Sequence, residues 1–471
     1  MISNSVFDFF INEQIGFMVN STKAFSGDIR LDSSHFVDDS NIIVSSEINF
    51  KHLNDFVKEI IEPKLFTRIF CEKQFGIPYI SSSEMSEIEP SINSRFISKE
   101  LTNNISQYII KRGQILVSAA GTVGSVVLAT KDLDGVAGTS DILRINVDSK
   151  INLGFIFTYL TSSYGANELA NLAYGAIIKR VRGFQLEALK TPVIDNNAKN
   201  EMNHLILEAL NLRDKANLLI KTARSLVLQY NNLPLLYQTD TFNLEKEVEI
   251  RLVNTSEFTN DYRLDAHFYN SMADLVVKNI KAFASNYRKI NEDIADKIFY
   301  LNRFTRTFVE KDFGIPYLAG KDIIKIRPTD VSYLSKSETY GLDDYKLEKG
   351  WILMTCSGTL GRTCYIWNNY EKWVGTHDLI RIVCKNHFDS GYLIAFLSSD
   401  YGYYQATRYK HGAVIDHLTP EQIEEIIIPI TDDSKMEEIG NLVRQAYDLR
   451  AEAILLEDKA QKILTEALTN A

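Results

Sequence analysis

Apolar residues recur at alternating steps of three and four along two long stretches of the chain. One stretch covers residues 202–230 and the other covers residues 439–467. Spacing of this kind, unbroken over about four heptads, is typical of helices that pair as a coiled coil. We expect the two helices to pair with each other antiparallel, which would make the chain pseudo-twofold.

The predicted contact line of this helix pair alternates leucine with alanine, and alanine allows two helix backbones to approach closely. The contact residues are Leu205, Ala209, Leu212, Ala216 and Leu219 in the first helix, and Leu442, Ala446, Leu449, Ala453 and Leu456 in the second. The alternative is that each helix packs on its own domain as an ordinary amphipathic helix, although a single buried face does not require spacing this regular.

Short apolar runs bounded by Gly, Asp and Ser come before each long helix. Residues 115–117, 126–128 and 142–145 are such runs, and they predict strands. Apolar stretches at 153–160 and 392–397 predict shorter helices. The fold class that we expect is α+β: two tandem related α/β domains, each followed by a long helix, with the two helices forming an antiparallel coiled coil.

The two halves of the chain repeat each other at a nearly constant offset. The sequence Phe-Gly-Ile-Pro-Tyr at residues 75–79 returns 238 residues later, and Gly175 returns as Gly412, 237 residues later. Arg-Leu-Asp at residues 30–32 returns at residues 263–265. Because chance matches would scatter in offset, the repeat indicates a duplication.

The repeat sets the expected domain boundaries. A proline followed by apolar residues, at Pro192 and at Pro429, predicts a strand that closes each domain. The expected parts are an N-terminal extension (1–24), a first domain (25–195), a first long helix (196–235), a second domain with its preceding linker (236–430) and a C-terminal long helix (431–471).

Composition points to a folded protein and excludes several classes. The chain has 45% hydrophobic and 24% charged residues. No apolar run approaches the roughly 20 residues of a membrane helix, and the four cysteines lack metal-ligand spacing. We expect a cytoplasmic protein with reduced thiols and no metal site. The net charge of −10 argues against unselective coating of nucleic acid, but it leaves room for local basic grooves.

One stretch looks like a phosphate-binding loop when it is taken alone. Residues 350–367 read GWILMTCSGTLGRTCYIW, while the copy at residues 113–130 reads GQILVSAAGTVGSVVLAT. The glycines recur but Arg362 does not, and a nucleotide-binding P-loop needs a longer glycine spacing and a lysine. The repeated part therefore predicts a strand, a tight turn and a second strand, in which glycine supplies unusual backbone angles.

The length of the long helices suggests a spacing between two binding surfaces. Each heptad series covers 29 residues, and a helix of that length measures roughly 43 Å. One turn of B-DNA measures about 34–36 Å. A helix pair with one domain at each end would therefore hold two related but different surfaces about one turn of DNA apart.

Two diverged domains, each with a G-x-I-L-x-S/T-x-x-G-T-x-G stretch and a long helix, resemble the specificity subunit of type I restriction–modification systems. Gly-Ala-Ile-Ile at residues 175–178 and Gly-Ala-Val-Ile at residues 412–415 add to the resemblance, which covers about residues 25–471. It implies a DNA sequence-specificity subunit with two target-recognition domains. Such a subunit recognises a bipartite asymmetric site and directs partner subunits to methylate adenine.

The resemblance also implies the partners. They are double-stranded DNA and methyltransferase subunits, two of them, which would dock on the long helices. S-adenosylmethionine would be bound by those subunits, and this chain would bind no cofactor. The complex would also admit a translocase/nuclease subunit. Residues 1–24, which have no counterpart in the second half, would belong to a partner-docking element or complete the end of the helix pair.

No catalytic motif is found in the sequence. An adenine methyltransferase carries an Asn/Asp-Pro-Pro-Tyr type tetrapeptide, and Pro-Pro does not occur in this chain. No strand-associated G-x-G-x-x-G for a cofactor occurs either. We expect a non-catalytic subunit. The alternatives are a stand-alone or regulatory binding protein without a methyltransferase partner, and an enzyme whose site shows no motif.

Side chains that contact DNA should be polar or basic and should lie near aromatic residues. Two basic clusters differ between the halves, whereas a Thr-Arg pair recurs and should bind phosphate or stabilise its loop rather than read bases. The candidates are Thr67, Arg68, Lys179, Arg180, Arg182, Thr305, Arg306, Arg362, Arg408, Tyr409, Lys410 and His411. The alternative for each cluster is a solvated helix face or an exposed cation without a role.

Several polar residues are better interpreted as structural. Asp141 recurs as Asp378, whereas the neighbouring His377 does not recur, so we expect two turn residues rather than an acid–base pair. Arg263 and Asp265 are expected to form an ion pair at the edge of the domain, as are their counterparts near the N-terminus.

Overall fold

The computed structural model divides into two compact units, which are described separately. Unit 1 comprises Met1–Ser86, Pro90–Glu208 and Leu456–Ala471, and unit 2 comprises Glu87–Glu89 and Ala209–Leu455. The structure describes residues 8–11, 14–17, 44–92, 94–120, 123–147, 150–175, 179–236, 252–253, 263, 265–328, 331–337 and 341–469. Among the motifs above, residues 30–32, 121, 176–178 and 264, and most of the extension 1–24, lie outside the described residues.

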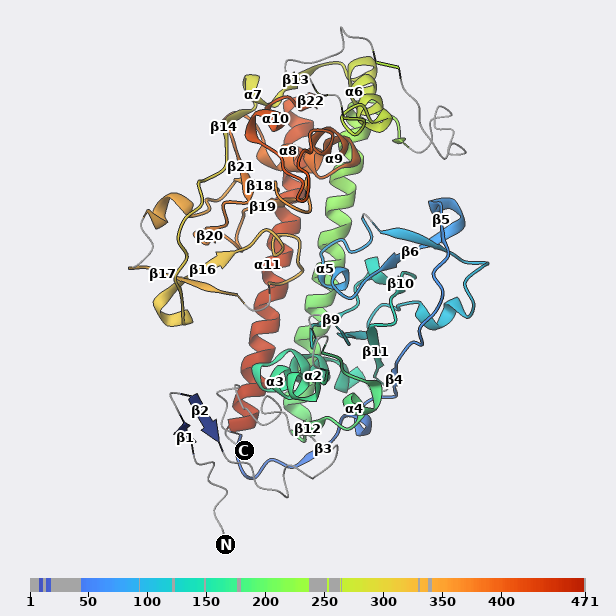
Figure 1. The fold of residues 1–471 in the computed structure, drawn as a ribbon, viewed down its shortest axis with the longest axis vertical. Coiled ribbons are helices and arrows are strands. Elements are labelled where there is room, and N and C mark those ends of the chain that lie inside the picture. The colour runs from blue at the N-terminus through green and yellow to red at the C-terminus, as the bar shows by residue number, and fades with distance from the viewer. Residues whose placement is uncertain are drawn as a thin grey trace. The chain divides into compact units, whose positions relative to one another are not determined.

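The described part of unit 1 contains two four-stranded sheets (Figure 1). One has the order β4-β11-β8-β9, formed by Glu59–Ile61, Ile142–Asn146, Ile115–Ser118 and Val126–Leu128. The other has the order β10-β6-β7-β5, formed by Ala137–Gly138, Gly76–Ile80, Arg95–Ser98 and Phe70–Cys71. Two-stranded pairs join β3 (Phe50–His52) to β12 (Lys190–Pro192) and β1 (Asp8–Ile11) to β2 (Gln14–Phe17). Between β11 and β12 lie α2 (Lys150–Thr161), α3 (Ser163–Leu172) and α4 (Gly183–Glu187).

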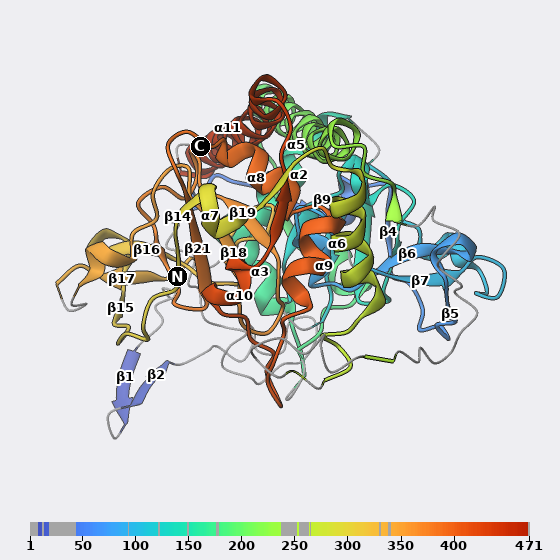
Figure 2. The ribbon, with the colours of Figure 1, turned by 90° about the horizontal axis from the view of Figure 1, so that it is seen from above.

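Unit 2 has the same two kinds of sheet in its described part (Figure 2). One has the order β14-β21-β18-β19, formed by Ala295–Phe299, Leu379–Cys384, Ile352–Thr355 and Thr363–Tyr365. The other has the order β15-β17-β16-β20, formed by Phe308–Val309, Tyr333–Ser335, Gly314–Leu318 and Val374–Gly375. β13 (Tyr287–Lys289) pairs with β22 (Ile427–Pro429). The helices are α6 (Ser271–Phe283), α7 (Ile290–Asp293), α8 (Ser390–Leu397), α9 (Asp400–Thr407) and α10 (Pro420–Glu424).

Strand for strand, the two units follow the same order. The sheet β14-β21-β18-β19 repeats β4-β11-β8-β9, and β15-β17-β16-β20 repeats β5-β7-β6-β10. Helices α8 and α9 follow β21 just as α2 and α3 follow β11. The tandem repeat predicted from sequence is therefore a repeat of fold, and the predicted strands at 115–117, 126–128 and 142–145 are confirmed.

The closing strand of each domain is shifted from its expected position. The sequence suggested that a strand begins at Pro192 and at Pro429, but β12 and β22 both end at these prolines. The expected strand position was therefore wrong, because each strand ends at its proline instead of beginning there. Proline has no N–H to donate to a sheet ladder, so it is accommodated at the end of a strand rather than within it.

The two long helices, α5 (Asn196–Tyr230) and α11 (Asp433–Thr469), pair antiparallel (Figure 1). Within unit 2, Arg450 of α11 donates a hydrogen bond to Asn217 Oδ1 of α5 at 3.1 Å. Tyr230, the last residue of α5, donates to Glu438 near the start of α11 at 2.8 Å. Later residues of one helix thus meet earlier residues of the other, which confirms the predicted pairing.

Each long helix contributes to both units, because α5 is divided after Glu208 and α11 after Leu455. Within unit 1, the amide of Gly154 on α2 donates to Asn203 Oδ1 of α5 at 3.1 Å. The amide of Gln461 on α11 donates to the carbonyl of Thr158, also on α2, at 3.1 Å. Parts of both long helices therefore pack on the same short helix of the globular domain.

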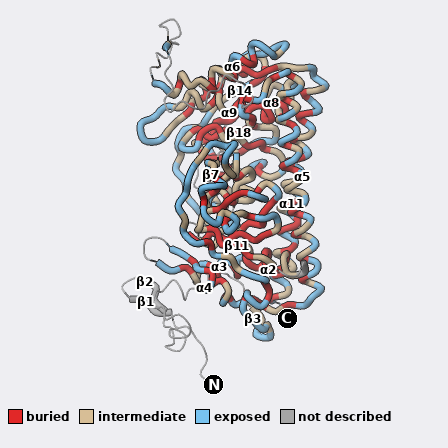
Figure 3. Tube along the Cα trace, turned by 90° about the vertical axis from the view of Figure 1, so that its right-hand side faces the viewer, coloured by how far each residue is buried: buried red, intermediate tan, exposed pale blue. Residues whose placement is uncertain are grey.

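Burial along the long helices is wider than one contact line (Figure 3). The alanines of the expected line are fully buried, whereas Leu205, Leu212, Leu219, Leu442 and Leu449 are half-buried. Ile220, Val227 and Val443, which lie next to that line, are buried in the core of unit 2. Full burial of each such side chain stabilises the fold by about 1.5–3 kcal/mol. Both interpretations of the periodicity therefore hold, since each helix pairs with the other and also packs on a globular core.

Helix α8 crosses α11 at a point where only glycine fits. A Cβ atom on Gly391 would lie 2.7 Å from the Cα atom of Gly440 and 2.8 Å from its carbonyl oxygen. Asp389 caps the start of α8 and also binds Arg444 of α11 through two bonds of 3.0 Å. The close approach is thus fixed by both backbone packing and an ion pair.

We expect Gly391→Ala to lower the free energy of unfolding of unit 2 by about 1–3 kcal/mol, because the two helix backbones must move apart. The urea midpoint of the purified chain measures the effect. Gly320→Ala is the matched control, since a Cβ there meets no atom within 4 Å. Equal midpoints for the two variants would contradict the tight crossing.

The sheet β4-β11-β8-β9 and its counterpart β14-β21-β18-β19 each carry a buried arginine that the sequence analysis did not identify. Arg144 on β11 is 2% exposed and Arg381 on β21 is fully buried. Arg381 donates to the carbonyls of Leu379 and Gly375, each at 2.9 Å, and burial lowers its pKa to about 10. Arg144 likewise donates to backbone carbonyls, those of Gln107 and Ile109. These side chains tie neighbouring loops to the sheet.

Residues 87–89, which include two glutamates, belong to unit 2. Arginines of that unit bind both glutamates. Glu89 accepts two hydrogen bonds from Arg224 of α5, at 2.5 and 2.7 Å. Glu87 accepts one from Arg362 at 2.8 Å. Burial on its own would raise the pKa of Glu89, but the charge and hydrogen bonds of Arg224 bring it down to about 2. The carboxylate is therefore ionised throughout the physiological range.

Candidate nucleic-acid interface

The Gly-Ala segment of each domain closes into a hairpin. In unit 2, the amides of His411 and His417 donate to each other's carbonyls at 3.1 and 2.6 Å. In unit 1, Tyr174 and Arg180 exchange the equivalent pair of bonds at 2.9 and 2.7 Å. We call residues 174–180 and 411–417 the Gly-Ala hairpins. Each has a stem that enters the tip and a stem that leaves it.

The first tip residue of each hairpin must be glycine. Gly175 and Gly412 have φ angles of +110° and +132°, which side-chain-bearing residues rarely adopt. A Cβ atom on Gly412 would also lie 2.0 Å from the carbonyl oxygen of Ile415. The recurrence of this glycine therefore follows from the backbone path of the hairpin.

The glycine-rich stretches support these hairpins. Strands β8 and β9 pair antiparallel, as do β18 and β19, so the predicted strand–turn–strand is confirmed. In unit 2, however, the connection runs over residues 356–362 and is a loop of seven residues rather than a tight turn. In unit 2 the amide of Gly358 donates to the carbonyl of Asp416 at 3.1 Å, which attaches the loop to the hairpin.

The hairpin brings the two basic clusters to the same place in their domains. Residues 408–411 lead into the tip in unit 2, whereas residues 179–182 lead out of it in unit 1. When the two halves are compared at the offset of 237 residues, the clusters do not occupy corresponding positions. Because the two stems of a hairpin lie side by side, both clusters nonetheless lie next to an equivalent closing pair, Tyr174 with Arg180 in unit 1 and His411 with His417 in unit 2.

The cations of unit 1 are available at the surface. Lys179 is exposed. Arg180 pairs with Asp141 at 3.3 Å and Arg182 pairs with Glu62 at 2.6 Å, with about half of each arginine side chain exposed (49% and 52%). Exposed ion pairs of this kind contribute about 0–1 kcal/mol. A phosphate can therefore replace either carboxylate at small cost.

The cluster of unit 2 is divided between buried and exposed groups. The Arg408 side chain is 13% exposed, binds Asp274 at 3.1 Å and lies over the ring of Phe268. Tyr409 packs on the same ring. Lys410 pairs with Asp416 at 3.4 Å across the hairpin, and His411 is exposed. The outer two residues are accessible, while Arg408 has a structural partner.

Arg362 also has a structural partner. Its side chain is 13% exposed and its guanidinium binds Glu87 at 2.8 Å. Its predicted contact with DNA would require this ion pair to open, and it stays a prediction.

The recurring Thr-Arg pairs lie on exposed loops that are anchored by aromatic residues. Thr67, Arg68, Thr305 and Arg306 are all exposed. Arg306 donates to the hydroxyl of Tyr317 at 3.0 Å, and Arg68 lies 5.9 Å from the ring centre of the equivalent Tyr79. The preceding phenylalanines pack inward on Tyr108 and Tyr345, with ring centres 3.9 and 4.1 Å apart. The same geometry in both units suits a contact that does not depend on base sequence.

The residues to which the sequence analysis assigned a structural role make local contacts typical of turns. The backbone amides of Asp141 and Asp378 donate to the hydroxyls of Thr139 and Thr376, which is turn geometry. Asp141 also accepts the ion pair from Arg180 described above. Burial lowers the pKa of His377, which contacts Asp378 at 3.3 Å.

Arg263 holds the entering stem of the hairpin in unit 2. It pairs with Asp265 at 2.6 Å, as predicted, and it also donates to the carbonyls of Tyr409 and Lys410 at 3.1 and 2.8 Å. The Arg-Leu-Asp motif thus fixes a distant part of the chain, which the sequence offset alone did not reveal.

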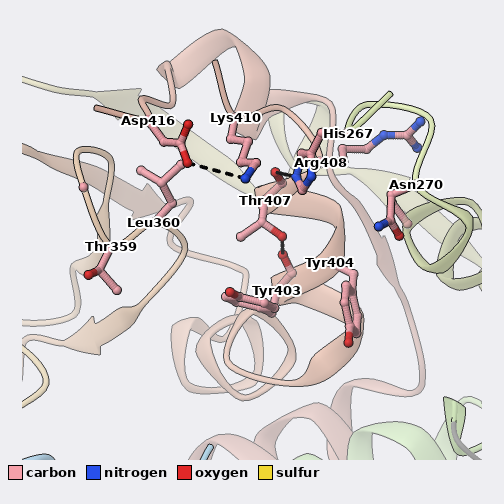
Figure 4. A pocket seen from close by; sticks show the side chains of 12 residues that line it. His267, Asn270, Thr359, Leu360, Tyr403, Tyr404, Thr407, Arg408, Lys410 and Asp416 are labelled. Atoms are coloured by element: carbon pink, nitrogen blue, oxygen red, sulfur yellow. Dashed lines mark hydrogen bonds and ion pairs between the residues drawn. The ribbon is translucent and has the colours of Figure 1, made fainter. Parts of the chain in front are cut away.

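A pocket of about 360 Å³ opens at the base of this hairpin (Figure 4). The lining comes from the glycine-rich loop, from α9, from the residues before and within α6, and from both stems: Gly358, Thr359, Leu360, Tyr403, Tyr404, Thr407, Arg408, His267, Asn270, Ala273, Lys410 and Asp416. The Lys410–Asp416 pair spans the two stems at its edge. The glycine-rich loop, α6, α9 and both stems thus meet around this pocket.

Sequence reasoning missed the residues at the tip. Val414 is 96% exposed and Ile415 is 53% exposed. Two aliphatic residues directly after Gly-Ala, in both halves of the chain, were the available signal. Their exposure depends on the hairpin and could not be read from the apolar pattern, which suggests burial.

Among the described residues, no helix is long and apolar enough to cross a membrane. No group of three or more His, Cys, Asp or Glu side chains in that same part of the chain is arranged to hold a metal ion.

Comparison with solved structures gives similar chains of low identity. The S subunit of a type I restriction–modification system from M. genitalium is 14% identical, with a TM-score of 0.35, and the match covers 91% of this chain and 99% of that one. The HsdS subunit from Thermoanaerobacter tengcongensis is 13% identical, with a TM-score of 0.28 and coverage of 92% and 99%. No curated protein matches.

The family comparison is more decisive. A model of the type I restriction modification DNA specificity domain matches residues 45–228 and again residues 309–452, which together are more than half of the chain. The two matches fall on the two repeated domains. The chain therefore belongs to the family of type I restriction–modification DNA specificity subunits.

Proposed function

We propose that this chain is the non-catalytic DNA-reading subunit of a cytoplasmic type I complex, in which each domain reads one half of a bipartite asymmetric site. The observation that carries the proposal is the pair of Gly-Ala hairpins. Each is closed by the same pair of backbone bonds, at equivalent positions of two domains with the same fold, and each has cations next to it. In unit 2 the tip residues Val414 and Ile415 are exposed. Cations that contact phosphates supply the sequence-independent part of DNA affinity.

The difference between the hairpins supports an asymmetric site. In unit 1 the cations follow the tip, and in unit 2 they precede it. Two equal half-sites would be served more simply by a homodimer of one domain. Helix α5, with 35 residues, is long enough to span about one turn of DNA.

The methylation reaction would be catalysed by partner subunits. Two methyltransferase subunits, one for each domain, would bind S-adenosylmethionine and methylate adenine, and this chain would hold no cofactor. A translocase/nuclease subunit would complete a restricting complex. The exposed Leu218 of α5 and Leu455 of α11 are apolar positions on the long helices that a partner helix could cover.

Methylome sequencing tests this function. We expect deletion of the gene to remove one bipartite methylated-adenine motif, and re-expression of the chain to restore it. The gap in that motif would follow from the helix length. If a methylation-competent strain loses no motif, the chain is instead a stand-alone or regulatory binding protein.

Replacing Arg263 by alanine tests the anchoring of the hairpin. We expect the DNA affinity of the assembled complex to fall roughly tenfold, equivalent to about 1.4 kcal/mol, because the entering stem loses two carbonyl contacts and must be ordered on binding. The dependence of affinity on salt should not change, since Arg263 is not proposed to touch phosphate. Fluorescence anisotropy titrations at several salt concentrations measure both.

The matched control is Arg288→Ala, which removes an exposed arginine of the same unit that pairs with Asp293. Its affinity should equal that of the wild type. An Arg263→Ala complex that binds as tightly as this control would show that the stem needs no anchor.

A further inference from the structure

The tip of the hairpin in unit 2 is apolar although it is exposed to solvent. Val414 is 96% exposed and Ile415 is 53% exposed, and they are adjacent. Single exposed aliphatic residues are common on protein surfaces. Two adjacent ones at the tip of a hairpin with polar stems are less common, and exposed apolar groups of this kind are often used in binding.

The tip is presented on a rigid base. Two backbone bonds between His411 and His417 close the hairpin, and the amide of Gly358 donates to Asp416 on the leaving stem. Arg263 holds the entering stem through two carbonyls. Little conformational freedom is lost when such a tip binds, which favours its use as an anchor.

The surroundings of the tip match DNA rather than an apolar protein groove. In unit 2 Lys410 and His411 precede the tip, and Asp416 and His417 follow it, with Lys410 and Asp416 forming a partly exposed ion pair at 3.4 Å that a phosphate can replace. In unit 1 Lys179 and Arg180 follow the Gly-Ala segment. Proteins that deform DNA combine cations on the phosphates with an aliphatic side chain inserted between neighbouring base pairs. An aliphatic side chain has no hydrogen-bonding group with which to distinguish bases.

We infer that Val414, supported by Ile415, is a wedge that enters the base stack of the half-site read by unit 2. The inference rests on the proposed function, because it assumes that this unit binds DNA. Gly-Ala followed by two aliphatic residues occurs in both halves of the chain, whereas the cations differ. The tip therefore has a task common to both half-sites, which is to deform the duplex, and the flanking residues distinguish the sequences.

The wedge gives this half-site an indirect sequence preference. Unstacking costs least at pyrimidine–purine steps such as TA and CA/TG. The half-site read by unit 2 should therefore contain such a step at the point of insertion, at a position that no polar side chain needs to contact.

The test uses the assembled complex and the bipartite site found by methylome sequencing. 2-Aminopurine is placed at each position of the half-site in turn, and its fluorescence reports unstacking. We expect wild-type binding to raise the fluorescence at one step, and Val414→Ser with Ile415→Ser to abolish that rise. Specific affinity should fall roughly 10- to 100-fold, as expected for losing about 1.4–2.7 kcal/mol. The salt dependence should stay that of the wild type, since no cation is removed.

Leu101→Ser is the control, because Leu101 is an aliphatic residue of unit 1 that is 63% exposed and lies outside both hairpins. Its complex should unstack the site as the wild type does. All variants should keep the thermal midpoint of the wild type, since the altered side chains are exposed.

Three results would overturn the wedge, and one would overturn the proposed function. If the fluorescence rise persists in the tip variant, Val414 and Ile415 do not unstack the bases. Equal losses of affinity from the tip variant and from replacing thymine by uracil indicate contact with a thymine methyl group instead. Failure of the tip variant to assemble with its methyltransferase subunits assigns the tip to a protein interface. A wild-type complex that binds no DNA contradicts the proposed function itself.

Discussion

Replacing Lys179, Arg180 and Arg182 together by alanine will weaken DNA binding by the assembled complex roughly 100-fold and will reduce its salt dependence. Each cation that neutralises a phosphate contributes about 0.9 to the slope of log affinity against log salt. Loss of three such contacts should lower the slope by about 2–3. The exposure of these side chains and the weakness of their ion pairs make them free to move onto phosphates.

The same titration with Lys58, Lys99 and Lys190 changed to alanine is the matched control. These three lysines are exposed in unit 1 and lie outside the hairpin, so the net charge changes equally. If both triple variants lose the same affinity, the loss results from the change in net charge rather than from contacts of the hairpin. If neither affinity nor slope changes in the hairpin variant, the cluster does not touch DNA.

A further variant separates the cations from their acidic neighbours. Asp141→Asn and Glu62→Gln together remove the carboxylates that Arg180 and Arg182 contact in the free protein. Binding should become tighter, because the phosphate no longer competes with an internal partner. A weaker complex would mean that these pairs position the arginines.

The change Glu89→Gln will destabilise unit 2 by about 3 kcal/mol at neutral pH. The side chains of Glu89 and Arg224 are 19% and 17% exposed, and removal of one partner leaves the other charge without compensation. Arg362 and Arg450 also act on this carboxylate, so their mutual repulsion grows when its charge is lost. Urea midpoints at pH 7 measure the loss.

The effect should disappear in acid. The pKa of Glu89 is lowered from 4.5 to about 2 in the folded chain. A depressed carboxyl pKa contributes stability that is fully present above pH 4.5 and is lost as the pH falls toward 2. The midpoints of wild type and Glu89→Gln should therefore converge between these values. Asp343→Asn, which breaks an exposed pair with Lys346, is the control and should cost under about 0.5 kcal/mol.

The sequence predicted the elements better than it predicted the surface. The 3-4 periodicity predicted both long helices and their pairing, because every turn of each helix buries the same face. The duplication predicted two equal folds. Neither signal could show that α5 and α11 each serve both units, since this depends on which distant segments meet.

The candidate DNA residues were predicted from polarity, charge, neighbouring aromatic residues and the comparison of the two halves, and none of these signals reports exposure. Arg362 and Arg408 are held by Glu87 and Asp274, which are distant in sequence. The tip residues were overlooked for the opposite reason, because an apolar pair is normally buried. Alignment by offset also separated the two basic clusters, since it compares positions along the chain and cannot bring the two strands of a hairpin together.

The hairpin has a consequence for how new specificities can evolve. Its backbone is fixed by Gly412, by the glycine-rich loop and by Arg263, and none of these groups needs to meet a base. In this chain the cations precede the tip segment in unit 2 and follow it in unit 1. Under the proposed function, a cation gained on one stem would compensate for a cation lost on the other. Point mutations on the stems would then change the target while the groups that hold the backbone of the hairpin stay in place.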